Sequence, residues 1–387
     1  MTFLFFFILL FLTAIAADYS FWKRHRASLC RHRWAVVWMV GSHLPLLVMI
    51  LSGWLARDNT TGWVFADIWL LWTWLLLTLP RMACYLFRWM HLPRVGVAIG
   101  IGVAGSLIWG ATIGRTTLRV SRTEISSAKL PAAFDGFRIV QLSDMHVGTL
   151  VSPERELQRI VDSVEALQPD LIVFTGDLVN IRASELNDRN TAVLRRLQAP
   201  YGVFSVIGNH DAGVYIKDSL RHPAAESMQE VIAWQRRSGW RVLEDTTVYL
   251  TRGGDSVSFS GISFDPALRK KRHDSKLPPA RLDVVYRGVP DSLFNITAVH
   301  LPQLWTQVLD FGYGDLTLAG HVHSMQMKLR ICGRSFSPAR LLYKRWSGRY
   351  DDGARTLYIN DGTGYVLYPM RLGAWPEISL ITLRRCE

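Results

Sequence analysis

The sequence predicts an α/β fold, in which two sheets form a sandwich with helices, preceded by an N-terminal region of membrane-spanning helices. Three observations lead to this prediction. Four long apolar stretches stand before residue 115, strand and helix patterns alternate after residue 118, and shorter strands follow toward the C-terminus. The expected domains are a transmembrane region over residues 1–114, a linker with a first edge strand over 115–136, and a globular domain over 137–387.

The apolar stretches are close to the length that a membrane helix needs, which is roughly 20 largely apolar residues. The expected helices cover approximately residues 1–22, 34–56, 63–80 and 95–114. A cleaved signal peptide is the alternative for the first of them. Its positive charges follow the apolar run, however, whereas a signal peptide carries them in front. We therefore expect about four retained spans.

Lys and Arg residues in the short loops predict the orientation of these spans. They gather in the loops at 23–33 and 81–94, and loops rich in Lys and Arg stay on the cytoplasmic side. The N-terminus and the globular domain would then face outward, although the arginines that follow the last span weaken this orientation. His43 and Asp67 lie within or beside the spans, and both a functional role and a packing role are open for them.

The overall charge does not by itself predict a nucleic-acid partner. The net charge is +12 and the chain is 49% hydrophobic, but much of the positive charge borders the apolar stretches. The four cysteines form no CxxC pair and no zinc-finger spacing, and a Cys332–Cys386 disulfide stays open. The basic run at 269–276 is either a solvated loop or a contact for anionic headgroups.

The globular part begins with units of strand, helix and strand. Apolar runs at 137–144, 171–177 and 203–207 are separated by segments with apolar residues at helical spacing. Such units predict a largely parallel sheet layered with helices. The later strands, which suggest a second sheet packed on the first, are expected at 254–264, 293–300, 315–323, 356–364 and 376–383.

Polar side chains collect where five of these strands end. They are Asp144 and His146, then Asp177, then Asn209 and His210, then His300, and finally His321 and His323. A turn would explain any one of them, but turns favour Gly, Ser and Asp and seldom supply so many histidines. Ligands bind beyond the carboxyl ends of strands in open α/β sheets. Carboxylate, amide and imidazole ligands suit two divalent cations, with Mn²⁺ expected first and Fe or Zn²⁺ as alternatives.

This donor set predicts a reaction class. Two divalent ions roughly 3.5–4 Å apart stabilise both the attacking and the leaving oxygen of a phosphoryl centre, and a hydroxide generated on the metal can attack phosphorus. One histidine outside the metal shell would protonate the leaving oxygen. We therefore expect a metal-dependent phosphoesterase.

The motifs DMH, GD, GNHD, VH and GHVH, in this order, resemble those of the calcineurin-like metallophosphoesterase superfamily, over roughly residues 137–387. The resemblance implies a four-layer α/β/β/α sandwich. It also implies specific roles: Asp144, His146 and His323 bind one metal ion, Asn209, His300 and His321 bind the second, Asp177 bridges the two ions, and His210 is the acid.

The spacing is also similar to that of a membrane-associated bacterial branch, which includes UDP-2,3-diacylglucosamine hydrolases and cell-wall-linked phosphoesterases. This implies a multi-pass protein of the bacterial inner membrane, and the Lys and Arg distribution predicts that the globular domain lies on the periplasmic side. The substrate would be a lipid-linked or envelope compound with a phosphodiester, phosphomonoester or pyrophosphate bond. The alternative is a membrane transport or assembly protein whose outer domain binds phosphorylated lipid without hydrolysing it.

The sequence departs from the family pattern at two places. The branch usually carries GHTHGGQ, whereas residues 320–326 read GHVHSMQ. Several members have an Asp that orients the catalytic histidine, and Asn180 stands there in this chain. Two further residues are weaker candidates. Asp211 is expected to support the ligands or to cap a helix, and Arg371 is expected to meet the substrate phosphate or to form a surface ion pair.

Overall fold

The computed structural model describes residues 2–29, 33–56, 58–218, 220–221, 223–270 and 277–386. The chain divides into two compact units, each described by itself below. The helical unit comprises Met1–Arg57, Gly62–Thr112 and Leu367–Pro369. The sandwich unit comprises Asp58–Thr61, Ile113–Val366 and Met370–Glu387.

The helical unit consists of α1 (Thr2–Leu29), α2 (Arg33–Gly41), α3 (Leu44–Leu55), α4 (Thr61–Trp89) and α5 (Pro93–Thr112). Within the described residues, three stretches are long and apolar enough to cross a membrane, namely Arg33–Leu55, Thr61–Trp89 and Pro93–Thr116. The number of four spans stays a prediction. The stretch expected as one helix over 34–56 consists of two, because Ser42 and His43 interrupt it just before Pro45, in the first turn of α3.

Asp18, His43 and Arg81 of the helical unit are polar partners of one another. His43 Nε2 lies 2.8 Å from Asp18 Oδ2, and Arg81 Nη2 donates to the same oxygen over 2.8 Å. Trp74 Nε1 donates to His43 Nδ1 over 3.1 Å. These contacts favour the packing role for His43, because polar groups inside a helical bundle are stabilised by pairing with one another.

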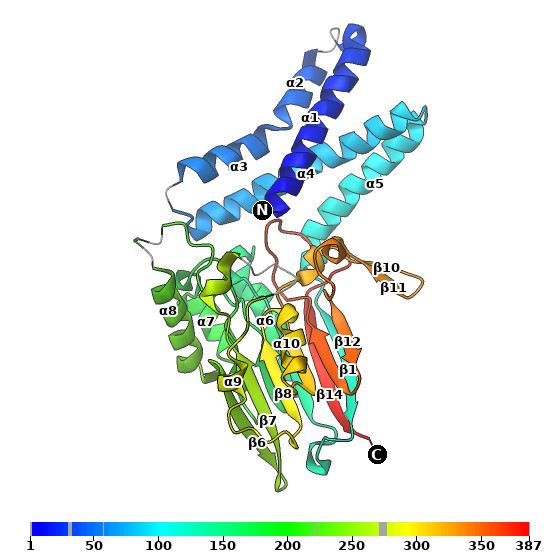
Figure 1. Cartoon of the computed structure of the whole chain (residues 1–387). Coiled ribbons are helices and arrows are strands. Elements are labelled where there is room, and N and C mark those ends of the chain that lie inside the picture. The colour runs from blue at the N-terminus through cyan, green and yellow to red at the C-terminus, as the bar shows by residue number, and fades with distance from the viewer. Residues whose placement is uncertain are drawn as a thin grey trace. The chain divides into compact units, whose positions relative to one another are not determined.

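The sandwich unit contains two six-stranded sheets (Figure 1). The first has the order β1-β14-β2-β3-β4-β5. Its strands are β1 (Arg119–Ser127), β14 (Glu377–Arg385), β2 (Arg138–Leu142), β3 (Leu171–Phe174), β4 (Val203–Ser205) and β5 (Trp240–Val242). Strands β2 to β5 are parallel, whereas β14 is antiparallel to β2 and parallel to the edge strand β1.

The second sheet has the order β12-β13-β9-β8-β7-β6. Its strands are β12 (Gly348–Asp352), β13 (Arg355–Ile359), β9 (Leu316–Ala319), β8 (Asn295–Val299), β7 (Asp255–Ile262) and β6 (Thr246–Arg252). The four central strands are parallel, and the two edge strands are antiparallel to their neighbours. A separate hairpin pairs β10 (Leu329–Ile331) with β11 (Arg334–Phe336).

The alternation of side chains along the strands builds three apolar layers. Ile139 of β2 and Phe259 of β7 belong to the core between the sheets. Val140, the next residue of β2, points to the opposite face, as successive strand residues do. It packs with α6 (Pro153–Leu167), α7 (Asp188–Leu194) and α8 (Ala224–Arg237). The outer face of the second sheet packs with α9 (Leu282–Val285) and α10 (Trp305–Asp310).

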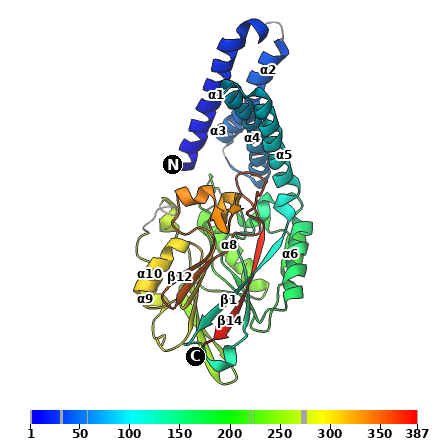
Figure 2. The ribbon, with the colours of Figure 1, turned by 90° about the vertical axis from the view of Figure 1, so that its right-hand side faces the viewer.

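The order of layers is therefore helix, sheet, sheet, helix, and Figure 2 shows the sandwich from the side. The predicted α/β/β/α fold is confirmed. Its central strands β2, β3, β4, β8 and β9 are the same strands whose sequence ends carry the candidate ligands.

Candidate metal centre

The candidate metal ligands from five strand ends lie together in the sandwich unit. Three overlapping groups have ligand atoms within 4.8 Å of one another: Asp144, His146 and His323; His146, Asp177 and His210; and Asp177, His300 and His321. All seven candidate ligands are buried. Segments that are far apart in the sequence thus bring their polar side chains to one place.

The first half of the cluster is built around His323. Its Nε2 lies 3.1 Å from Asp144 Oδ1 and 3.1 Å from Nε2 of His146. His146 Nε2 is 3.8 Å from the same Asp144 oxygen and 3.9 Å from Asp177 Oδ2. Three donor atoms therefore surround one small volume, and Asp177 stands at its border.

The second half is built around His300. Its Nε2 lies 3.1 Å from Asp177 Oδ2 and 3.0 Å from the amide oxygen of Asn209. His300 Nδ1 lies 2.8 Å from the backbone carbonyl oxygen of Thr175, which can only accept a hydrogen bond. Nδ1 therefore carries a proton, and Nε2 is the ring atom that faces Asp177. The ring of His321 packs edge-on against the His300 ring. Asp177 is the residue that both halves share.

The donor atoms are better suited to binding divalent cations than to hydrogen bonding with one another. Imidazole nitrogens and carboxylate oxygens face each other over about 3 Å, and two of the facing atoms are both Nε2. His146 Nδ1 is buried without a hydrogen-bond partner. A buried polar group without a partner is costly, and histidine, carboxylate and amide donors are those that borderline divalent metals prefer. The residues therefore fit the two metal ions that the resemblance implies.

Charge interactions act on the titration of these groups. Burial opposes ionisation of Asp144, but the neighbouring His323 lowers its pKa to about 2. Burial lowers the pKa of His300, yet the Asp177 carboxylate outweighs this and raises that pKa to about 9. Burial and the charges of His210 and His323 hold the pKa of His146 well below its usual value. The Asp144 carboxylate thus stays ionised at neutral pH and attracts positive charge.

The backbone at the ligands is left-handed, a conformation that residues other than glycine seldom adopt. The residues concerned are Asp144 (φ 51°), His146 (φ 45°), Asp177 (φ 61°), His321 (φ 74°) and His323 (φ 53°). Strain of this kind persists only where the surroundings fix it, and it concentrates at functional sites. It continues into Ser324 and Met325, with φ of 51° and 48°. These two residues replace the two glycines of the usual GHTHGGQ pattern and adopt a glycine-like conformation.

His210 borders the cluster and is positioned by the loop after β3. Its Nδ1 lies 2.5 Å from the backbone carbonyl oxygen of Asn180, and its Nε2 lies 4.0 Å from Asp177 Oδ2. The main chain of Asn180 makes this contact, although its side chain stands where several family members carry the orienting Asp. Burial lowers the pKa of His210. The ring of Tyr215 packs against that of His210, with centroids 4.2 Å apart.

The segment that carries Tyr215 contacts the short segment Asp58–Thr61 of the sandwich unit. Asn59 Nδ2 donates to the carbonyl oxygen of Tyr215 over 2.7 Å, and Asn59 Oδ1 accepts from the Lys217 N–H over 2.9 Å. Arg182 forms a two-pronged ion pair with Asp58, over 3.0 and 2.6 Å. These contacts brace the segment that carries Tyr215.

Asp211 lies behind the ligands. Its carboxylate accepts hydrogen bonds from the backbone N–H groups of Asp177, Leu178, Val179 and Gly208, over 2.8 to 3.1 Å. Burial, together with the charge of Asp177, raises the pKa of Asp211 to about 7. This carboxylate holds the loop that presents Asp177.

Glu185 has a similar position that the sequence analysis missed. Its buried carboxylate accepts from the N–H groups of Gly148, Asn180 and Ile181, over 3.1, 2.5 and 2.8 Å. It thus ties the loop after His146 to the loop whose carbonyl holds His210. Burial raises the pKa of Glu185 to about 7. Glu185 follows no strand end and belongs to no motif, so its sequence position gave no signal.

Arg371 does not occupy the position of a substrate ligand. Its side chain is fully buried, and it donates to the carbonyl oxygens of Gly364 and Ala374 over 2.7 and 2.9 Å. Its Nη2 lies 3.3 Å from His323 Nδ1. Both the phosphate contact and the surface ion pair expected for Arg371 were therefore wrong, because this buried guanidinium holds the C-terminal loop against the candidate ligand His323.

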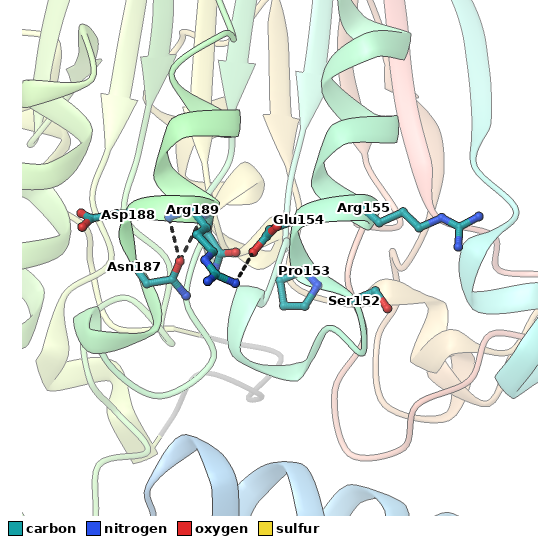
Figure 3. Close-up of a pocket in the computed structure, with 8 residues that line it drawn as sticks. Ser152, Pro153, Glu154, Arg155, Asn187, Asp188 and Arg189 are labelled. Carbon is teal, nitrogen blue, oxygen red and sulfur yellow. Dashed lines mark hydrogen bonds and ion pairs between the residues drawn. The ribbon is translucent and has the colours of Figure 1, made fainter.

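Other sequence features lie away from the cluster. A surface pocket between the starts of α6 and α7 is lined by residues 152–155 and 187–190, with Glu154 and Arg189 paired over 3.6 Å (Figure 3). The candidate ligands are outside it. Cys332 and Cys386 are exposed and free, so the structure contains no disulfide between them. In the basic run at 269–276, residues 271–276 lie outside the described part of the chain.

Comparisons with known proteins agree with this geometry. The model of the calcineurin-like phosphoesterase family matches residues 137–325. The uncharacterized metallophosphoesterase YkuE of Bacillus subtilis is 31% identical over 275 residues, which are 67% of this chain and 83% of that protein. A transmembrane protein with metallophosphoesterase domain of Danio rerio is 30% identical over 275 residues, 69% of this chain and 57% of that protein.

A shorter match links the chain to a protein with a named substrate. The UDP-2,3-diacylglucosamine pyrophosphatase LpxG of Chlamydia trachomatis is 33% identical over 133 residues, which are 32% of this chain and 40% of that protein. The motifs, the fold, the clustered ligands and the extent of the YkuE match lead to one conclusion. The chain belongs to the calcineurin-like phosphoesterase family and is a metal-dependent phosphoesterase.

Proposed function

We propose that this protein is a membrane-anchored phosphoesterase with two divalent cations, which hydrolyses a phosphodiester, phosphomonoester or pyrophosphate bond in a lipid-linked or envelope substrate. The observation that carries the proposal is the position of Asp177. Its Oδ2 lies 3.1 Å from His300 Nε2 in one half of the cluster and 3.9 Å from His146 Nε2 in the other. A single carboxylate shared by two donor sets is the arrangement that a two-metal site requires.

The residues divide into two ligand sets. Asp144, His146 and His323 would hold one cation, Asn209, His300 and His321 would hold the other, and Asp177 would bridge them. Oxygen and imidazole ligands favour Mn²⁺, with Fe and Zn²⁺ as alternatives. Bound there, the two cations would supply an activated water and neutralise the charge on the phosphoryl oxygens.

His210 is the proposed general acid. It lies beside Asp177. Its Nδ1 contacts the backbone carbonyl oxygen of Asn180, so that Nε2 is the ring atom that would face a substrate oxygen. Because the carbonyl can only accept, Nδ1 keeps its proton and the imidazole has one fixed orientation. In its doubly protonated form, the imidazolium would give the proton on Nε2 to the leaving oxygen and become neutral imidazole with its proton on Nδ1.

The membrane and the substrate class enter as part of the same proposal. Three stretches of the described chain are apolar and long enough to span a membrane, and the relative LpxG is named for a lipid substrate. An enzyme tethered in this way meets lipid-linked phosphates at high local concentration. We place it in the bacterial inner membrane, with the sandwich unit on the periplasmic side because of the Lys and Arg distribution.

The test uses the full-length protein in detergent or nanodiscs. Chelator-treated protein is loaded with Mn²⁺, Fe²⁺, Zn²⁺ or Mg²⁺ and assayed with bis-p-nitrophenyl phosphate, p-nitrophenyl phosphate and a UDP-linked diacyl sugar. The proposal expects turnover with Mn²⁺ and a higher kcat/KM for the lipid-linked substrate. Absence of turnover with every ion, together with tight binding of the lipid, would instead support the non-hydrolysing alternative.

The proposed side of the membrane has its own test. Reporter fusions at the loop near residue 57 and at the C-terminus distinguish the two orientations in cells. An active periplasmic reporter at the C-terminus is expected. Activity of only a cytoplasmic reporter fused to the C-terminus would overturn the periplasmic location. It would leave the proposed hydrolysis unaffected.

A further inference from the structure

The segment after the last metal ligand has an unusual composition. Residues 328–345, here called the basic hairpin, contain six Lys or Arg residues and neither Asp nor Glu. The segment comprises β10, β11 and a short 3-10 helix, Pro338–Leu341. Figure 1 shows β10 and β11 projecting from the body of the sandwich unit. The basic run at 269–276 is a separate part of the chain.

The pairing of β10 with β11 sorts the side chains of the hairpin onto two faces. Leu329 pairs with Phe336, and Ile331 pairs with Arg334. Directly paired residues share a face, and residues two apart on one strand also share a face. Leu329, Ile331 and Phe336 therefore form one apolar face that ends in the guanidinium of Arg334. Arg330 lies on the opposite face.

This apolar face is exposed. Leu329, Ile331 and Phe336 are 60%, 50% and 42% exposed, and Leu341 in the following 3-10 helix is 85% exposed. Large apolar side chains that gather in this way on a surface mark a site of contact with a partner or a membrane. The two residues at the tip, Cys332 and Gly333, have φ of 48° and 78°, as in a two-residue type I′ turn.

Positive charges lie on both faces of the hairpin and in the segment that follows it. Lys328 is bound by Asp361, and the Arg345 guanidinium lies over the Trp305 ring, 4.4 Å from its centroid. The four other cations, Arg330, Arg334, Arg340 and Lys344, are exposed. Exposed apolar side chains among Lys and Arg, without acidic residues, match an anionic lipid surface, with the apolar side chains at the acyl boundary and the cations at the headgroups.

The hairpin is also connected to the metal centre. It begins five residues after His323, and Tyr343 near its end has its hydroxyl 3.5 Å from His321 Nε2. The end of the hairpin segment is therefore in contact with one of the candidate metal ligands. A second copy of this chain or another protein would also cover an apolar face, but four exposed cations in a segment without acidic residues favour the phosphate groups of a bilayer over the mixed charge of most protein surfaces.

We propose that the basic hairpin docks onto the anionic lipid surface of the membrane that holds the helical unit, with Leu329, Ile331, Phe336 and Leu341 inserted among the headgroups. The docked hairpin would deliver lipid-linked phosphates to the metal centre. This inference rests on the membrane anchoring in the proposed function, but it does not depend on which bond is hydrolysed.

The chain offers its own probe for a test. Cys332 lies at the hairpin tip, and Cys386, which is also exposed, lies just after β14. The full-length protein is prepared with Cys332 alone or with Cys386 alone, the other cysteines being changed to Ser. Each form is labelled with an environment-sensitive NBD fluorophore and reconstituted into vesicles of phosphatidylcholine, with or without phosphatidylglycerol.

The expected result is a blue-shifted emission for the Cys332 label in vesicles that contain phosphatidylglycerol, with quenching by doxyl lipids and protection from aqueous acrylamide. The Cys386 label should stay accessible to acrylamide in both kinds of vesicle. Leu329→Ser with Ile331→Ser should abolish the shift. Arg330→Gln with Arg334→Gln and Arg340→Gln should reduce it to the value in neutral vesicles.

Turnover of bis-p-nitrophenyl phosphate serves as the control, and it should change less than twofold in these variants because the substituted residues lie outside the metal centre. Equal acrylamide quenching of the Cys332 and Cys386 labels in anionic vesicles would overturn the proposal. A shift of equal size in neutral vesicles would also overturn it. A shift that appears in detergent and grows with protein concentration would assign the face to a second copy of the chain.

Discussion

The Nδ1 atom of His210 lies 2.5 Å from the backbone carbonyl oxygen of Asn180. A carbonyl oxygen only accepts hydrogen bonds, so this contact fixes the proton on Nδ1 and directs Nε2 toward Asp177. It also makes the position of His210 depend on the path of the main chain after β3 and not on the side chain at position 180.

His210→Ala should reduce kcat by about 10²–10⁴-fold, the usual contribution of a general acid. The loss should be smaller for an aryl ester than for an alkyl ester, because a good leaving group needs no proton. Bound metal should be unchanged. Steady-state kinetics with both esters measure the difference, and His91→Ala, at an exposed residue outside the site, is the matched control. Equal losses with both leaving groups would contradict the role of acid.

Asn180→Ala should retain most of the activity, since the contact with His210 uses the main chain. Wild-type-like kcat/KM with an alkyl ester is expected. A loss as large as that of His210→Ala would show that the Asn180 side chain orients the imidazole after all.

Asp177→Asn should impair both metal sites, because Asp177 is shared by the two ligand groups. An amide cannot supply the charge or the second oxygen that a bridging position requires. Elemental analysis of the purified protein after dialysis should find less than one metal ion per chain. Asp188→Asn, at an exposed residue of α7, should retain the wild-type content. Two tightly held ions in the Asp177 variant would contradict the bridging assignment.

Gly208→Ala should weaken metal binding although the substitution is small. A Cβ atom at position 208 would lie 2.1 Å from Asp177 Oδ1, so the carboxylate would have to move. Overpacking of this kind costs about 1–3 kcal/mol. Gly105→Ala is a suitable control, since its Cβ would meet nothing within 4 Å. The measurement is the metal dissociation constant of each variant. Equal constants for Gly208→Ala and Gly105→Ala would contradict the predicted weakening of metal binding.

Glu185→Gln should change how stability depends on pH in the metal-free protein. The pKa of Glu185 rises on folding from 4.5 to about 7, because burial disfavours the carboxylate. The folded chain therefore binds the proton more tightly than the unfolded chain, and this stabilisation is present below pH 4.5 and lost as the pH rises to about 7. The Tm of the wild type minus the Tm of Glu185→Gln should therefore decrease as the pH rises from 4.5 to about 7. A difference that is independent of pH would contradict the shifted pKa.

Most of the fold could be predicted from the sequence because its signals are local. The strands β2, β3 and β4 are apolar runs separated by helical periodicity, and this pattern specifies parallel pairing. The break between α2 and α3 at Ser42 and His43 was not predicted. Their neighbours are apolar enough to continue a helix, and hydropathy alone does not locate a two-residue interruption.

The candidate ligands could be predicted for the same reason, since parallel strands bring their carboxyl ends to one edge. The residues that support the candidate ligands were harder to predict from the sequence. Glu185 acts through three backbone N–H groups of loops that come together only in the folded chain. Arg371 was expected to meet phosphate or to form a surface ion pair, and it is buried, because its carbonyl partners belong to a loop whose path the sequence does not encode locally. The left-handed backbone at Ser324 and Met325 likewise follows from tertiary packing and not from residue preference.

The most direct test of the central claim is a calorimetric titration of the chelator-treated, full-length protein with Mn²⁺, with hydrolysis of bis-p-nitrophenyl phosphate measured at each point. The account predicts binding of two equivalents of Mn²⁺, with turnover that appears as the second site fills and is absent from Asp177→Asn. A single equivalent with full turnover, or turnover that persists in excess chelator, would contradict it.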